Sequence, residues 1–303
     1  MGSRGRGRKT VEFRDRAAEI LETIQPATVR AVAYKLFSEG LIPNMSKSST
    51  ARVSRILTGA REDGKVPWEW IVDNTRKPTH PGTYSSPMAF GRSVSRWWDQ
   101  DPWEYQDVRV EIWSEKDTVS GLLGPVLDEF KVAFRVNRGF TSATAAHDIA
   151  EDTANSDKPL IAFYVGDYDP SGLYMSEMDL PARLEKYEAG DVEIRRLALV
   201  DVDLVPLQHL SFPAADKSKD PRYRWYRAKT GQTRCWELDA MNPNVLRDRV
   251  REAIRREIEP DAWERVQVTD RAVRHSLDAH MAAWTKAKST LRLVQEYEGE
   301  AQP

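Results

Sequence analysis

The chain has 303 residues, of which 40% are hydrophobic and 30% are charged. That length suggests roughly two domains, each large enough to bury its own core. A single cysteine, Cys235, excludes an intramolecular disulfide and a zinc site built from several cysteines. No apolar run approaches the ~20 residues of a membrane-spanning helix, and none follows the basic start MGSRGRGRK, so we expect a cytoplasmic protein without membrane association.

The net charge of −2 hides an asymmetry along the chain. Residues 1–61 contain twelve lysines or arginines and five acidic residues, an excess of seven positive charges, which leaves −9 for the remainder. A basic segment of this kind is typical of proteins that bind the phosphate backbone of a nucleic acid. A solubilising tail followed by solvated helix faces explains the charge equally well, so both interpretations stay open.

The front of the chain reads as a tail followed by three helices. Residues 1–10 form a basic tail that we expect to be disordered. Apolar residues recur at helical spacing in VEFRDRAAEILETIQ and in TVRAVAYKLFSEGLI, and SSTARVSRILTGAREDGKV predicts a third, basic helix rich in small residues. The pattern over residues 11–76 resembles a winged-helix, or helix-turn-helix, DNA-binding domain.

The middle of the chain alternates between strand and helix patterns. Strands are expected at 108–113, 132–136, 160–165 and 192–199, and helices at 117–129, 142–154 and 172–187. This alternation predicts an α/β fold over residues 108–205, with a Rossmann-like parallel sheet covered by helices on both faces.

Two further segments flank this α/β part. Residues 77–107 are rich in Pro, Gly, Ser and Trp, and we interpret them as an ordered linker whose aromatic side chains are buried. Residues 206–303 break into Pro-rich loops and two or three helices, which predicts a helical C-terminal extension.

Three acidic residues follow the ends of two predicted strands. Glu115 lies in EIWSEKDT, and Asp167 and Asp169 lie in LIAFYVGDYDPSG. Ligands bind beyond the carboxyl ends of parallel strands, and side chains at i and i+2 of an extended segment point the same way. Three such carboxylates suit Mg²⁺, which can clamp a phosphodiester. Alternatively, Asp169 begins a helix as its N-cap, and Glu115 forms a solvated ion pair with Lys116.

These motifs resemble the Toprim domain, which topoisomerases, primases and some nucleases share. SEKDT is similar to the Glu-Lys pair of the topoisomerase VI A subunit and its relative, the meiotic double-strand-break protein, and GDYDPSG is similar to that family's Asp-x-Asp-Pro-x-Gly. NRGFTS, at 137–142, is similar to the family's Gly-aromatic-Pro/Thr segment. The resemblance covers about residues 108–200 and implies a Toprim fold with Mg²⁺ held by Glu115, Asp167 and Asp169.

The same family carries a catalytic tyrosine on a helix of the domain that precedes Toprim, in the pattern Arg-x-x-aromatic-Tyr. Here VRAVAYKLF offers Arg30 and Tyr34, which share a helix face because they are four residues apart. The resemblance implies that Tyr34 attacks a DNA phosphate held by Arg30, while another subunit's Toprim domain supplies the metal. From helix position alone, Tyr34 is more simply a core residue whose hydroxyl reaches the rim of the helix.

Several basic side chains are candidates for contacts to DNA phosphates. Arg52 and Arg55 share a face of the third predicted helix, and Arg61 lies some way round it. Lys116 and Arg138 lie within the Toprim-like motifs. Such contacts would position a duplex without reading its sequence, although a plain solvated surface accounts equally well for any one of the helix arginines.

Together these features predict a Mg²⁺-dependent enzyme that cleaves double-stranded DNA, similar to the A subunit of a type IIB topoisomerase and acting as a homodimer. The sequence contains no Gly-x-x-x-x-Gly-Lys-Ser/Thr loop, so ATP-driven strand passage would need an ATPase B-type subunit or another partner protein. Two alternatives stay open. One is a hydrolytic Toprim nuclease with no covalent intermediate, and the other is a non-catalytic DNA-binding regulator.

Overall fold

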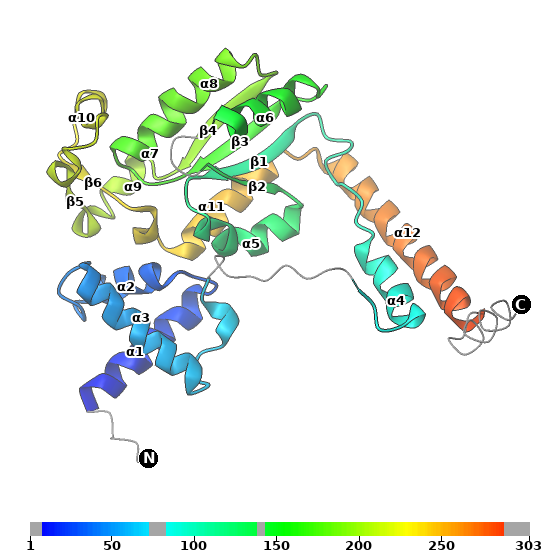
Figure 1. Ribbon diagram of the computed structural model, residues 1–303, viewed down its shortest axis with the longest axis horizontal. Coiled ribbons are helices and arrows are strands. Elements are labelled where there is room, and N and C mark those ends of the chain that lie inside the picture. The colour runs from blue at the N-terminus through cyan, green and yellow to red at the C-terminus, as the bar shows by residue number, and fades with distance from the viewer. Residues whose placement is uncertain (1–7, 73–82, 138–142, 288–303) are drawn as a thin grey trace, which may run out of the picture. The chain divides into compact units, whose positions relative to one another are not determined.

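The computed structural model describes residues 8–72, 83–137 and 143–287. The chain divides into two compact units. The first contains Met1–Arg76 and Val108–Glu257, and the second contains Lys77–Asp107 and Ile258–Pro303. Figure 1 labels the elements of both units along the chain.

Three helices open the first unit. They are α1 (Arg8–Ile24), α2 (Val29–Ser38) and α3 (Lys47–Glu62), followed by the short η1 (Trp68–Trp70). Thr28 caps α2 by accepting a hydrogen bond from the Ala31 N–H, and the apolar faces of the three helices meet in one buried core. Within residues 8–72 the only β pairing is a parallel bridge between Ala27 and Ile71, so these residues form a three-helix part without a β-hairpin wing.

An α/β part follows in the same unit, and it confirms the predicted α/β class with a parallel sheet. Its elements are β1 (Arg109–Ser114), α5 (Thr118–Phe130), β2 (Ala133–Val136), α6 (Ala143–Ala154), β3 (Leu160–Val165), α7 (Pro170–Tyr174), the π-helical turn η2 (Met175–Asp179), α8 (Leu180–Lys186) and β4 (Val192–Ala198). The sheet is parallel with strand order β2-β1-β3-β4. Every residue of β3 is buried, because α6 and α8 cover one face while α5 and α11 (Pro243–Arg256) cover the other (Figure 1).

The strand order reverses between β1 and β3. The chain passes from β1 to β2 on one side and then crosses to β3 on the other side of β1. In open parallel sheets, the crevice at such a reversal is the usual ligand site. Trp113 of β1 pairs with Tyr164 of β3, so the two strands end side by side, and the loops carrying Glu115 and Asp167 both leave at this point.

The rest of the first unit folds back onto the end of β3. It consists of α9 (Asp201–Leu204), η3 (Gln208–Leu210), β5 (Phe212–Pro213), η4 (Ala214–Lys217), α10 (Tyr223–Thr230), β6 (Arg234–Cys235), η5 (Leu238–Ala240) and α11. Just after β6, Trp236 forms an isolated antiparallel bridge with Tyr168, with N–H to O distances of 2.9 and 3.0 Å. Backbone pairing therefore fixes residues 236–239 beside the loop that follows β3.

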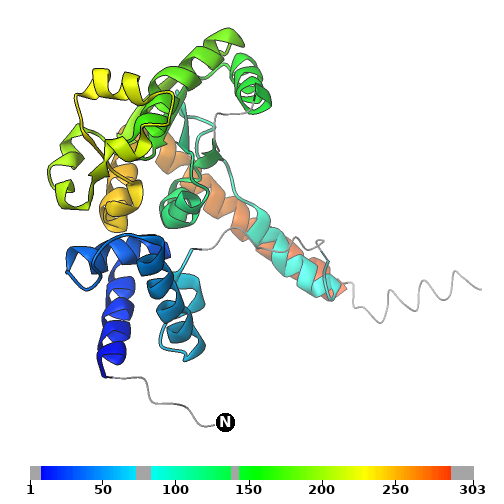
Figure 2. The same cartoon turned by 60° about the vertical axis from the view of Figure 1, so that its left-hand side comes forward.

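The second unit is built on α4 (Pro87–Trp97) and α12 (Pro260–Ala287), which lie side by side in Figures 1 and 2. The segment interpreted from sequence as a linker thus contains a helix that packs on the chain's last described helix. Trp103 is buried against Trp263, with ring centroids 5.6 Å apart, whereas Trp97 stays exposed. None of the described helices is both long and apolar enough to span a membrane.

Candidate functional site

The loop after β3 carries both predicted aspartates in buried positions. Asp169 caps α7, because its carboxylate accepts a hydrogen bond of 2.8 Å from the Gly172 N–H. Asp167 accepts a hydrogen bond of 2.7 Å from the Leu238 N–H. The helix-start interpretation of Asp169 is therefore confirmed, and it leaves the second carboxylate oxygen of Asp169 available for other contacts.

Arg196 of β4 holds this loop in shape. A guanidinium has five N–H donors, and all five of those on Arg196 are used within the fold. They donate to the carbonyls of Gly166 (3.1 Å), Asp167 (2.5 Å), Gly172 (3.0 Å) and Leu199 (2.8 Å) and to the Ser176 hydroxyl (2.7 Å). Arg196 is thus a positioning residue for the loop after β3 that carries Asp167 and Asp169, the acidic loop. It has no N–H left to donate to a ligand.

Close packing fixes the same loop at Gly172. A Cβ added there would lie 2.4 Å from the Asp167 carbonyl oxygen, so we expect Gly172→Ala to lower the free energy of unfolding by about 1–3 kcal/mol. Gly124→Ala in α5 is the matched control, because no atom lies within 4 Å of its added Cβ and alanine favours a helix by up to about 1 kcal/mol. Urea denaturation measures both. Equal stability of the two variants would show that the loop tolerates displacement.

Two lysines bind the paired aspartates. The Lys116 ammonium lies 2.7 Å from an Asp167 oxygen and 3.1 Å from an Asp239 oxygen, and Lys217 lies 3.1 Å from Asp169. Burial alone would lower the pKa of Lys116, but the carboxylates of Asp167 and Asp239 outweigh it and raise that pKa. Lys116, which the sequence predicted as a DNA contact, is an ion-pair partner of the acidic loop.

Glu115 adds a third carboxylate to this edge of the sheet. Burial raises the pKa of Glu115 to about 7, and the negative charges of Asp167 and Asp169 contribute to that rise. Burial also raises the pKa of Asp167, with the Asp169 charge acting in the same direction. The three carboxylates predicted from sequence are therefore close enough to disfavour one another's charge, which a cation would relieve.

Two buried polar groups at this edge support such a site. The Tyr164 hydroxyl and the Asn137 side-chain amide have no hydrogen-bond partner among the described residues. Burial and the Glu115 charge raise the pKa of Tyr164. Asn137 lies just beyond β2, where its main-chain N–H donates to the Ser114 carbonyl. Buried polar groups are normally satisfied, so unpaired ones indicate a place for water or an ion.

The donor set fits Mg²⁺, which prefers hard oxygen ligands and keeps several of its waters. Within the described residues, no three Asp, Glu, His or Cys side chains are spaced to hold a metal ion, and lysines bind two of the three predicted ligands instead. Metal binding by Glu115, Asp167 and Asp169 therefore stays a prediction. It would require Lys116 and Lys217 to release their ion pairs with the two aspartates.

The predicted tyrosine and arginine meet a carboxylate that sequence reasoning missed. Arg30 donates through Nε and, at 2.6 Å, through a terminal nitrogen to Glu237, and the Tyr34 hydroxyl donates to Glu237 at 3.2 Å. Tyr34 is only 3% exposed, and burial followed by the Glu237 charge raises its pKa. Close by, Thr28 donates to Asp239 at 2.8 Å.

Residues 237–239 connect the predicted Arg30–Tyr34 pair to the predicted acidic site. Glu237 faces Arg30 and Tyr34 on α2, the Leu238 N–H binds Asp167, and the Asp239 carboxylate receives both Thr28 and Lys116. The tyrosine is thus linked through residues 237–239 to the acidic loop of its own chain, whereas the resemblance implied a metal from another subunit. A signal was present in the sequence, because Glu237 and Asp239 in TRCWELDAM repeat the i, i+2 spacing of Asp167 and Asp169.

The predicted DNA-contact residues of α3 differ in their surroundings. The Arg52 guanidinium lies 4.5 Å from the ring centre of Phe13, and that of Arg61 lies 4.2 Å from the ring of Trp68 and donates to its carbonyl. Arg52 and Arg55 are exposed, so they keep a basic surface on α3. Arg138 and residues 139–142 of NRGFTS lie outside the described residues.

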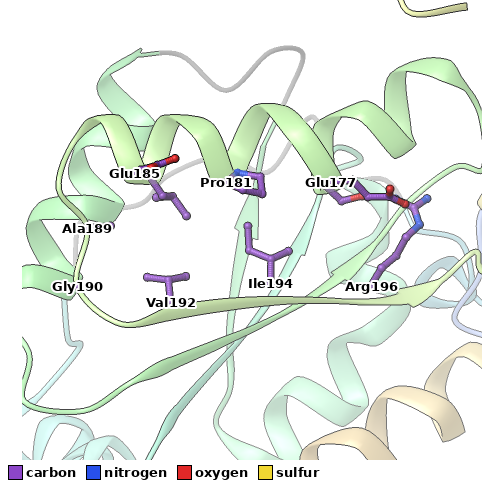
Figure 3. Close-up of a pocket in the computed structure, with 10 residues that line it drawn as sticks. Glu177, Pro181, Glu185, Ala189, Gly190, Val192, Ile194 and Arg196 are labelled. Atoms are coloured by element: carbon purple, nitrogen blue, oxygen red, sulfur yellow. The ribbon is translucent and has the colours of Figure 1, made fainter. Parts of the chain in front are cut away.

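The pockets at Tyr34 and at Arg196 differ in their lining. One of about 520 Å³ borders Tyr34 and is also lined by Lys35, His209 and Arg249. The other, of about 470 Å³, lies between α8 and β4. Figure 3 shows Pro181 of α8 above Ile194 of β4, with Glu177 and Arg196 together at one end. Because the N–H groups of Arg196 are all used, this second pocket offers little for binding an anion.

Comparison with protein-family models and with curated proteins gave no significant match for this chain.

Proposed function

We propose that this protein is a Mg²⁺-dependent enzyme that cleaves double-stranded DNA, with a Toprim-like α/β domain and Tyr34 as the nucleophile. One observation carries the proposal: residues 237–239 link Tyr34 and Arg30 to Asp167 and Lys116 within one chain. A nucleophile, a cation for the phosphate and an acidic edge suited to a metal are the components that this reaction needs.

Each of these residues would have a separate role in cleavage. Tyr34 would attack phosphorus and form a phosphotyrosyl link, and Arg30, whose guanidinium carbon lies 5.8 Å from the Tyr34 ring centre, would neutralise the phosphate. Mg²⁺ held by Glu115, Asp167 and Asp169 would supply positive charge to the phosphate and to the oxygen that leaves. Lys116 and Lys217 balance the aspartates until that ion is present.

The N-terminal helices would form a DNA-binding domain related to the winged-helix class. The excess of positive charge in residues 1–61 and the exposed Arg52 and Arg55 on α3 support contacts to the phosphate backbone. A homodimer would present two symmetric sites, one for each strand of the duplex, and so produce a double-strand break.

A second candidate function is hydrolysis of DNA by water at the same acidic edge. The burial of Tyr34 favours it, because a phenol that is 3% exposed, with its pKa raised by burial, is a poor nucleophile until something releases it. In that case Tyr34 and Arg30 only dock α2 onto Glu237.

Cleavage of supercoiled plasmid separates these functions. The protein is incubated with plasmid and Mg²⁺, the reaction is stopped with SDS, and the DNA is run with and without proteinase K. We expect nicked or linear DNA that carries attached protein, no product with EDTA, and none with Tyr34→Phe or Asp167→Ala. Tyr105→Phe is the matched control, because that tyrosine is 62% exposed and should not affect cleavage.

The other outcomes are equally informative. Free DNA ends from Tyr34→Phe at the wild-type rate would establish hydrolysis by water. Tight binding of DNA without Mg²⁺ and without any cleavage would identify a non-catalytic regulator.

A further inference from the structure

We propose that Glu237 is a catalytic residue of this site, which accepts the phenol proton of Tyr34 during attack and holds Arg30 beside it. The inference rests on the proposed function and deepens it, because it assigns a proton acceptor that neither the sequence motifs nor the Toprim resemblance supplied.

The carboxylate of Glu237 is shared between the two groups. Its Oε1 accepts a hydrogen bond of 2.6 Å from a terminal nitrogen of Arg30. Its Oε2 accepts from both Arg30 Nε and, at 3.2 Å, the Tyr34 hydroxyl. A general base must lie within hydrogen-bond reach of the proton that it removes, and Oε2 of Glu237 meets that condition.

The backbone on either side of Glu237 is fixed. Trp236 is bridged to Tyr168 in the acidic loop, and its indole N–H donates to the Leu207 carbonyl at 3.1 Å. On the other side, the Leu238 N–H binds Asp167 at 2.7 Å. The position of the carboxylate is therefore set by the same loop that carries the predicted metal ligands, which couples the proton acceptor to the acidic edge.

Several other ionisable groups lie near Tyr34. Arg30 and Lys35 lie on α2 itself, and the elements packed against it contribute His209, Asp203, Arg249, Glu237 and Asp239. Asp203 is paired with Arg249, and Asp239 binds Thr28 and Lys116. Among the described carboxylates, Glu237 is the one that receives the Tyr34 hydroxyl.

Glu237 also contributes to structure, because both of its oxygens bind Arg30. The side chains of Arg30 and Glu237 are 42% and 22% exposed. A test of its catalytic role therefore needs readouts that a structural contact alone would not change.

The chemical step balances in atoms and charge. The Tyr34 O–H bond breaks and its proton passes to Oε2 of Glu237. An electron pair of the phenolate oxygen forms the O–P bond, and the P–O bond to the deoxyribose breaks with its pair on the sugar oxygen. That oxygen takes a proton from water, and Glu237 later returns its own proton to solvent.

The test compares Glu237→Gln with Glu62→Gln, an exposed control on α3. Glutamine still accepts the Tyr34 hydrogen bond but cannot take its proton. At pH 7 we expect covalent protein–DNA complex to form about 10²-fold to 10⁴-fold more slowly with Glu237→Gln, and the rate to recover as pH rises and solvent deprotonates the phenol. Glu62→Gln should follow the wild-type pH profile.

A second readout does not depend on activity. The Tyr34 phenol is titrated by ultraviolet absorbance as the difference between each protein and its Tyr34→Phe counterpart. Burial raises the pKa of the Tyr34 phenol and the Glu237 charge raises it further, so Glu237→Gln should move the titration midpoint to lower pH. If Glu237→Gln does not fold, Glu237→Asp is used in its place. It retains a carboxylate, so it should keep the wild-type pH profile.

The proposal is overturned if Glu237→Gln forms covalent complex at the wild-type rate at pH 7. It is overturned equally if the loss is the same at every pH and the phenol midpoint does not move, since both would follow from a structural contact alone. A wild-type protein that forms no covalent complex would instead overturn the proposed function, and this failure is seen before any Glu237 variant is compared.

Discussion

Replacing Arg247 with methionine is expected to lower the free energy of unfolding by about 3 kcal/mol or more. Arg247 lies on α11 and is 7% exposed. Its guanidinium donates to the carbonyls of Ile24 (2.8 Å), Gln25 (3.0 Å), Pro26 (3.0 Å) and Leu122 (3.1 Å) and to the Asn244 side chain (2.6 Å). One side chain thus joins the end of α1 to α5 and α11.

The magnitude follows from what methionine would leave behind. It fills a similar volume, but four main-chain carbonyls lose a charged donor, and each such loss costs about 1 kcal/mol or more when water cannot replace it. Burial lowers the pKa of Arg247 and so opposes its charge, while the carbonyls at the C-terminal end of α1 favour a cation there.

Arg256→Met on the same helix is the matched control. That side chain is 73% exposed and, among the described residues, pairs with Glu252 one turn away, so its loss should change stability by less than about 0.5 kcal/mol. Urea denaturation measures the free energy of unfolding of both variants. Similar unfolding midpoints for the two variants would mean that water reaches the carbonyls around Arg247 and that the junction is weaker than its contacts indicate.

The strands of the α/β part follow closely from local sequence. The run LIAFYV predicted a strand at 160–165, which is the extent of β3, and VRVEIW at 108–113 is shifted by one residue from β1. Such runs are apolar throughout and end at turn residues, so their bounds are encoded nearby. The helix predicted at 172–187 instead divides at the π-turn Met175–Asp179, where Ser176 receives Arg196 from a distant strand.

The candidate site shows the same limit of local patterns. Asp167 and Asp169 stand out as a pair in the sequence, and Lys116 stands out as part of SEKDT. Their ion pairs do not, because Lys116 and Lys217 reach the loop only through tertiary folding. Glu237 is equally hidden, since the bridge between Trp236 and Tyr168 that places it joins residues far apart in the chain. Spacing shows which residues share a face, but not which distant loop that face meets.

Changing Glu115 to glutamine is expected to stabilise the metal-free protein at pH 8 by about 1–3 kcal/mol. Burial and the charges of Asp167 and Asp169 raise the pKa of Glu115 from 4.5 to about 7 in the folded chain. Folding therefore favours the protonated side chain. Above pH 7 the ionised carboxylate destabilises the folded state, and glutamine, which carries no charge, removes that penalty.

The gain should depend on pH in a defined direction. Below about pH 4.5 Glu115 is protonated in the folded and unfolded chains alike, so the two proteins should be equally stable. The difference grows between pH 4.5 and 7 and is complete above pH 7. Glu193→Gln is the control, because Arg195 lowers the pKa of that exposed carboxyl and its removal should bring no gain at pH 8.

Magnesium should act against this difference between the two proteins. A cation that binds only the folded state adds about 1.4 kcal/mol at ten times its dissociation constant and about 2.7 kcal/mol at a hundred times. We expect this gain, measured as a rise in Tm, for the wild type and little of it for Glu115→Gln. An equal rise in both proteins would exclude Glu115 as a ligand, and an unstabilised Glu115→Gln variant would mean that the three carboxylates are not crowded. A structural ion pair behaves in the opposite way, because losing one of its charges lowers stability whether or not a metal is present.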